Sequence, residues 1–186
     1  MTMRILPLDP AHASGDALRA LQSPVGRMTL FGLLARADSV VLAVMRLGGQ
    51  ILSKQSLDAR SRELMVLLAL RLENGRYEWP QHVDIAKAVG ISDDEIRAIE
   101  ELAFERAFNG RDRALLHFAY AVVENVRVDD ETYAALRCYL DETQLIEAIV
   151  DIGFYMMLAR VTEALEVGPD PVQGVNVLRS LDAPIA

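Results

Sequence analysis

The sequence predicts an all-α fold, and three observations lead to this prediction. Apolar residues make up 52% of the 186-residue chain and aromatic residues only 6%, so the core must be aliphatic, a composition that suits helices better than sheets. Signals for helix starts and stops recur along the whole chain. No segment shows the convincing apolar–polar alternation of a half-buried strand.

The N-terminal part of the chain predicts an arm followed by short helices. Residues 1–10 contain two prolines and are expected to be extended. Helical patterns follow at 17–21 and 27–36, and the first ends at a Ser-Pro pair because a residue before proline avoids the α region. We expect Asp38 to cap the next helix, which the Gly-Gly pair at 48–49 weakens.

The strongest helix signals lie in the middle of the chain. Asp58 is placed as the N-cap of a helix over 59–73. The Asn-Gly pair at 74–75 ends that helix, because glycine readily adopts the left-handed conformation. A second helix is predicted from about residue 79 to Gly90, and the turn between the two permits an antiparallel helix pair.

The remainder of the chain predicts four more helices. Residues Ser92–Glu95 form a capping box that opens a helix to about residue 102. Three aspartates, Asp112, Asp129 and Asp141, are placed as caps of helices that reach about residues 125, 139 and 165. The last of these is apolar around most of its circumference, so we expect another subunit to bury part of it. The last fifteen residues are expected to be an irregular tail.

These signals together predict one compact domain with appended segments. We place an N-terminal arm and helical extension at 1–55, the core at 56–167 and a C-terminal tail at 168–186. The net charge is −8 and the basic residues are scattered, so neither nucleic acid nor an anionic membrane surface is an expected partner. Arg46 and Asp151 interrupt the most apolar stretches, so no membrane span is expected.

The single cysteine, Cys138, excludes an intramolecular disulfide, a CxxC redox pair and a zinc site built from several cysteines. One cysteine fits a reducing compartment, and the N-terminus lacks the pattern of a signal peptide. A cytoplasmic location is therefore expected.

Three residues form the candidate site. Glu78 and His82 lie four positions apart, so helix geometry would place them on one face. A carboxylate beside an imidazole sets the tautomer of the imidazole, and such a pair can move protons near neutral pH. Glu63 precedes His82 by nineteen positions, and the antiparallel helix pair could bring it back across to His82.

The region from about residue 58 to 102 resembles the carboxymuconolactone decarboxylase family of the alkylhydroperoxidase-like superfamily. Three motifs carry the resemblance in the right order: Arg62-Glu63-Leu64, then Tyr77-Glu78-Trp79-Pro80-Gln81-His82, then Gly90-Ile91-Ser92 with Glu95-Ile96. In the alkylhydroperoxidase branch, a C-x-x-C pair precedes the histidine. Its cysteines would fall on Gly75 and Glu78, and neither residue can form a thiolate. Peroxide reduction by a cysteine pair is therefore excluded.

The resemblance implies an alkylhydroperoxidase-like helical bundle and a lyase or isomerase that uses no cofactor and no metal. Its implied substrate is a small carboxylated lactone or a related acid. His82 would be the general acid/base, Glu78 would orient it, and Glu63 would complete the relay. Arg76, Tyr77 and Trp79 are the residues expected to contact the substrate. The superfamily commonly forms dimers, trimers or hexamers, so a homo-oligomer is expected.

Two alternatives to this lyase or isomerase stay open at this point. One is a catalytically silent oligomeric or ligand-binding protein, whose pocket would be too apolar or too closed for proton transfer. A backbone hydrogen bond that locks the buried imidazole of His82 would favour it. The other is a metal site built from His82 with Glu63 and Glu78, which is a thin ligand set for zinc or iron.

Overall fold

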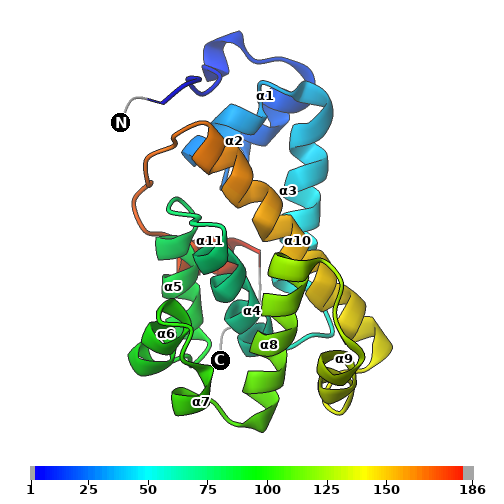
Figure 1. Ribbon diagram of the computed structural model, residues 1–186. Helices are drawn as coiled ribbons and strands as arrows, with labels where there is room; N and C mark the ends of the chain where they lie inside the picture. The colour runs from blue at the N-terminus through cyan, green and yellow to red at the C-terminus, as the bar shows by residue number, and fades with distance from the viewer. Residues whose placement is uncertain (1–2, 182–186) are drawn as a thin grey trace.

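The long helix α10 (Glu142–Ala164) connects the two halves of the molecule in the computed structural model, which describes residues 3–181. Figure 1 shows α10 running diagonally from the N-terminal helices to the helices of the core. The N-terminal half contains a short 3-10 helix and three α-helices: Pro10–His12, α1 (Gly15–Gln22), α2 (Thr29–Leu34) and α3 (Asp38–Ser53). The other half contains α4 (Ala59–Leu72), α5 (Trp79–Ala88), α6 (Asp93–Glu100), α7 (Phe104–Ala107), α8 (Gly110–Asn125) and α9 (Asp130–Arg137), with α11 (Gly174–Ser180) packed on α5. The described residues therefore form an all-α structure, as predicted.

Helix α4 is the centre of the core. Every residue from Ser61 to Leu70 is buried, and the helix packs against α5, α6, α8 and α10. Its N-terminus is the predicted one, because Asp58 accepts a hydrogen bond from the backbone N–H of Ser61 at 2.9 Å. A helix with neighbours on all sides must bury its polar side chains as well, so Arg62 and Glu63 lie in the interior.

The predicted antiparallel pair is formed by α4 and α5. Asn74 takes a left-handed conformation with φ 55°, and the N–H of Gly75 bonds the carbonyl of Leu70, which closes the end of α4. Pro80 lies in the first turn of α5, where its missing N–H costs no helical hydrogen bond. The reversal brings α5 alongside α4, and this pairing places the candidate site.

Three features of the helices differ from the prediction. Asp38, which was expected to cap a helix, is the first residue of α3, and its carboxylate accepts a hydrogen bond from the N–H of Ala17 in α1 instead. Helix α3 continues through the Gly-Gly pair to Ser53, because Gly48 lets Phe154 of α10 approach closely: a Cβ atom there would lie 3.1 Å from the Phe154 ring. Helix α8 begins at Gly110 with Asn109 as its cap, and Asp112 lies inside the helix. Asp112 is buried, and its carboxylate forms an ion pair with Nη2 of Arg60 at 2.9 Å. This tertiary contact uses the side chain that was expected to cap the helix.

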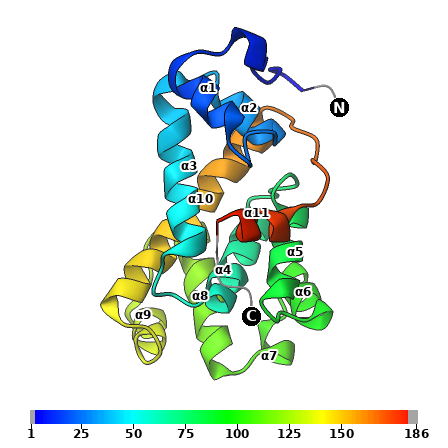
Figure 2. The same cartoon turned by 180° about the vertical axis from the view of Figure 1, so that it is seen from behind.

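Part of the tail that was expected to be irregular is the helix α11. It lies directly against α5, since a Cβ atom on Gly174 would come 2.1 Å from the carbonyl oxygen of Gln81. Figure 2 shows α11 in front of α4 and α5, on the side opposite to α9. Leu178 of α11 is fully buried between Leu52 and Ile85, so apolar packing keeps the segment in place. The short helix α7 was not predicted.

Helix α10 leaves part of its apolar surface exposed in the single chain: Ile146, Ile149, Val150 and Met157 are each at least 39% accessible. The expected burial of this face by another subunit stays a prediction. Within residues 3–181, none of the helices combines the length and the apolar character that a membrane crossing requires.

Candidate functional site

A buried carboxylate–imidazole pair links α4 to α5. The Nδ1 atom of His82 lies 2.7 Å from Oε2 of Glu63, and the two side chains are 7% and 0% exposed. If Nδ1 carries the proton, it donates to the carboxylate and leaves Nε2 as the basic nitrogen. The sequence predicted that Glu78 would orient His82, but the structure gives this contact to Glu63. Although Glu78 lies only one turn before His82, its carboxylate bonds Thr162, and the facing helix α4 aims Glu63 at the ring.

Arg62 holds the other side of the Glu63 carboxylate. Its Nε donates to Oε1 of Glu63 at 3.0 Å, and its Nη1 reaches the backbone carbonyls of Ile51 and Leu52 at 3.3 and 3.5 Å. Arg62 is 2% exposed, so this ion pair is shielded from water. The C-terminal end of α3 is thereby tied to the candidate site.

These partners decide the charge of Glu63. Complete burial alone would raise its pKa, but the charge and hydrogen bond of His82, followed by those of Arg62, outweigh burial and hold the pKa below its ordinary value. Glu63 is therefore a carboxylate that stabilises a positive charge on the neighbouring imidazole.

Glu78 has the opposite electrostatic character. Burial raises its pKa from 4.5 to about 7, against the lowering effect of hydrogen bonds from its own backbone and from Thr162. The Thr162 hydroxyl lies 3.0 Å from both carboxyl oxygens of Glu78 and 3.1–3.2 Å from the carbonyls of Ala159 and Leu158. An ionised Glu78 can accept from this hydroxyl. A protonated Glu78 can donate to it while the hydroxyl turns to a carbonyl. The site therefore accommodates Glu78 in both protonation states.

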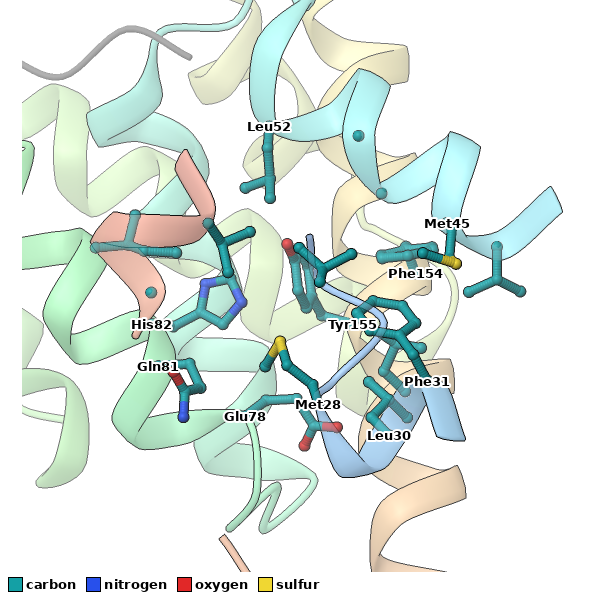
Figure 3. A pocket seen from close by; sticks show the side chains of 18 of the residues that line it. Met28, Leu30, Phe31, Met45, Leu52, Glu78, Gln81, His82, Phe154 and Tyr155 are labelled. Carbon is teal, nitrogen blue, oxygen red and sulfur yellow. The ribbon is translucent and has the colours of Figure 1, made fainter. Parts of the chain in front are cut away.

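Both His82 and Glu78 line a small cavity between the two halves of the molecule. Its volume is about 110 Å³. Figure 3 shows His82, Gln81 and Glu78 at one end, and Phe31, Met45 and Phe154 at the other. The N-terminal helices, which lie outside the motifs of the sequence, supply much of the apolar wall: Met28, Leu30, Phe31, Val44, Met45 and Leu52. The cavity thus has one polar end and one apolar end.

Tyr155 of α10 completes the polar end. Its ring meets the imidazole of His82 edge to face, with the ring centroids 4.4 Å apart. Neither the Tyr155 hydroxyl nor Nε2 of His82 forms a hydrogen bond with any residue of the described chain. Burial raises the pKa of Tyr155 well above its ordinary value, so the hydroxyl stays protonated. The cavity therefore offers a basic nitrogen and a neutral hydroxyl donor side by side.

The C-terminal segment closes the cavity next to α5. Tyr77 donates to Asp170 at 2.6 Å, and Asp170 also accepts from the backbone N–H and the hydroxyl of Thr29 at 2.7 and 2.6 Å. The side-chain amide of Gln81 donates to Pro171 at 3.1 Å and accepts from the N–H of Gln173 at 2.8 Å. Tyr77 lines the cavity as expected, but its hydroxyl is used to hold this segment to α2.

This arrangement of residues lies in a region that is similar in sequence to a known family of proteins. Residues 39–121 match the model of the family described as "Carboxymuconolactone decarboxylase family". This match includes Glu63, Glu78 and His82 in the order that carried the resemblance. Residues 39–121, which hold the candidate site, are thus similar to this family. Among proteins of curated function, none matches the sequence.

Solved structures share the fold of this protein at low sequence identity. An uncharacterized peroxidase-related protein from Ralstonia eutropha JMP134, described as an alkylhydroperoxidase AhpD core, is 18% identical with a TM-score of 0.76, covering 90% of this chain and 92% of its own. The debrominase Bmp8 in complex with 2,3,4-tribromopyrrole is 19% identical with a TM-score of 0.72, covering 98% and 97%. A protein of unknown function from Agrobacterium tumefaciens is 22% identical with a TM-score of 0.67, covering 75% and 96%. The alkylhydroperoxidase-like fold is thus established.

Two residues expected to contact a substrate lie outside the cavity. Arg76 binds Glu163 on the surface through Nε and Nη2, at distances of 2.6–3.2 Å. Trp79 is half-buried and packs against the core, on the side of α5 away from the cavity lining. Arg76 lies just before the motif and Trp79 lies within it, but neither side chain lines the cavity.

Other residues of the site were not predicted. Thr162 and Tyr155 belong to α10, and no local motif connects them to α5. The only signal in the sequence is a hydroxyl group on a helix that is apolar around most of its circumference. Within residues 3–181, no group of three or more His, Cys, Asp or Glu side chains is arranged to hold a metal ion. Glu63, Glu78 and His82 are therefore not arranged as such a group.

Proposed function

We propose that this protein is a cofactor-free proton-transfer enzyme, a lyase or isomerase, that acts on a small ring compound at the polar end of the cavity. The observation that carries the proposal is the 2.7 Å contact between His82 and Glu63. It orients the imidazole and leaves Nε2 as a base at the cavity wall. The similarity of residues 39–121 to the carboxymuconolactone decarboxylase family supports this type of chemistry.

The geometry supports a division of roles. Nε2 of His82 takes a proton from the carbon next to a substrate carbonyl, and the Glu63 carboxylate stabilises the imidazolium that forms. The electron pair moves onto the carbonyl oxygen, where the Tyr155 hydroxyl is a suitable donor. Glu78, whose pKa of about 7 keeps it partly protonated at neutral pH, is a second proton source. In a lyase the same enolate forms by loss of CO₂, and a proton then returns to carbon.

The alternative of a catalytically silent binding protein predicts a different contact. It expects a backbone hydrogen bond on the His82 imidazole, whereas the partner of Nδ1 is a carboxylate. A structural histidine does not require the charged Arg62–Glu63 pair behind it, because burying that pair has a desolvation cost. We therefore favour the enzyme.

Proton transfer can be tested without knowing the natural substrate. The protein is incubated in D₂O with α-angelica lactone or with 4-carboxymuconolactone, and deuterium incorporation and product formation are followed by NMR. We expect turnover of at least one compound. His82→Ala should reduce the rate by about 10²–10⁴-fold, and Tyr155→Phe by a smaller factor. The matched control is His117→Ala, since His117 is exposed on α8 and contacts Glu105. Unchanged rates in a folded His82→Ala protein would refute the proposal.

A further inference from the structure

The charge pattern of the cavity restricts what it can bind. Of the described residues that line it, none is a lysine or an arginine. Glu78 lines it directly, and Glu63 lies immediately behind His82. A ligand at the polar end therefore meets up to two carboxylates and, at most, the positive charge of one protonated imidazole.

The arginines nearest in sequence to the site residues have other partners. Arg62 donates through Nε to Glu63 and through Nη1 to the carbonyls of Ile51 and Leu52. Its Nη2 is buried and has no hydrogen-bond partner within the described chain, but Arg62 is not among the cavity-lining residues. Arg76 is bonded to Glu163 on the surface. Neither guanidinium is placed to bind an anion inside the cavity.

An anionic ligand would lose its hydration without gaining a cationic partner. A buried carboxylate is costly unless a charged or hydrogen-bonding group compensates for the lost water. Beside Glu78 it would also raise the pKa of that residue further, since neighbouring like charges disfavour the ionised form. An uncharged ring meets neither penalty, because apolar side chains surround it and the Tyr155 hydroxyl can donate to one oxygen.

Volume adds a second restriction. The cavity measures about 110 Å³, well below the roughly 300–1,000 Å³ of pockets that hold drug-sized ligands. Phe31, Met45 and Phe154 line its apolar end, and this small volume suits a single ring better than an extended or branched acid.

We infer that the cavity selects a small uncharged ring compound with one carbonyl or hydroxyl oxygen and discriminates against carboxylates. The inference rests on the proposed function and narrows it to proton shifts within a neutral ring. The C–H bond next to the carbonyl breaks, and its proton passes to Nε2 of His82. The electron pair passes through the enolate, and the proton returns to the γ-carbon as the double bond moves. No CO₂ is lost and no co-reactant is consumed.

The selection is tested first by binding alone, with phenol and benzoate as probes. They share one ring, and at about pH 8 phenol is uncharged while benzoate is an anion. By calorimetry we expect phenol to bind at least about 10-fold more tightly. Glu78→Gln removes a negative charge and should narrow this difference. Val25→Lys places a cation at the half-buried edge of the cavity and should raise benzoate affinity, and Val25→Gln is its uncharged control.

Three outcomes of the binding experiment would overturn the inferred selection. Benzoate binding as tightly as phenol, or no binding of either compound, would overturn the selection. A preference for phenol that Val25→Lys leaves unchanged would also overturn it, because charge would then not be the cause.

The second test compares turnover of α-angelica lactone with that of the same lactone carrying a carboxymethyl group in place of its methyl group. Faster turnover of the carboxylated compound, lost in His82→Ala, would overturn the selection and leave the proton-transfer function standing. Selective phenol binding with no exchange of either lactone would support the selection and count against the function.

Discussion

Glu63 and Glu78 are the same residue type at similar burial, yet their environments drive their pKa values in opposite directions. Glu63 is fully buried and has its pKa lowered, whereas Glu78 is 4% exposed and has its pKa raised to about 7. The difference lies in their partners: Glu63 contacts a guanidinium and an imidazole, whereas Glu78 bonds only neutral groups, the Thr162 hydroxyl and its own backbone. Burial alone therefore does not set protonation, and one site can hold an ionised carboxylate near a carboxyl group that is partly protonated at neutral pH.

The largest effect is expected from neutralising Glu63. Glu63→Gln leaves the Arg62 guanidinium buried without its counter-charge, and removing one partner of a buried ion pair typically costs about 3–5 kcal/mol. Urea unfolding measures this loss, and the deuterium-exchange rate should fall with it. Glu163→Gln is the matched control, because Glu163 also pairs with an arginine but at the surface, so a much smaller change is expected. Equal losses of unfolding free energy in the two variants would contradict a larger contribution from the buried pair.

Glu78→Gln tests the opposite sign. Burial favours the neutral form of Glu78, so the folded state binds more protons than the unfolded state between pH 4.5 and about 7. The unfolding free energy of the wild type should therefore decline across this window, by on the order of 3 kcal/mol from this residue. The variant has no titrating group at this position, so its unfolding free energy should match that of the wild type near pH 4 and exceed it at pH 8. Parallel stability curves would contradict the raised pKa. Burial also raises the pKa of Asp151 to about 7. Its contribution to the unfolding free energy should therefore decline over this pH window by the same amount in both proteins.

A smaller effect is expected from the hydroxyl beside Glu78. Thr162→Val removes the hydrogen bond that lowers the pKa of Glu78, so that pKa should rise by about one further unit. If protonated Glu78 contributes to the reaction, the pH at which the exchange rate falls off should rise by a similar amount. The pH–rate profile with α-angelica lactone measures this shift. A profile that moves downward would assign the limb to another group.

Much of the fold was readable from local patterns. The caps at Asp58, Ser92, Asp129 and Asp141 are where they were predicted, because a side chain that bonds an N–H three residues later is a local event. The helix α11 and the start of α8 were missed or misplaced. Both depend on contacts with distant segments, namely α5 for the first and Arg60 for the second.

The candidate site divides in the same way. The sequence by itself singled out Glu63, Glu78 and His82 as candidate site residues, excluded a cysteine pair, and predicted the antiparallel turn that brings two helices together. Only the tertiary structure decided that Glu63 rather than Glu78 bonds His82, that Arg76 faces away, and that α10 supplies Tyr155 and Thr162. The physical reason is that spacing along one helix fixes which residues share a face. The facing helix fixes which of them meet, and the resulting burial and charge decide which carboxyl group holds a proton.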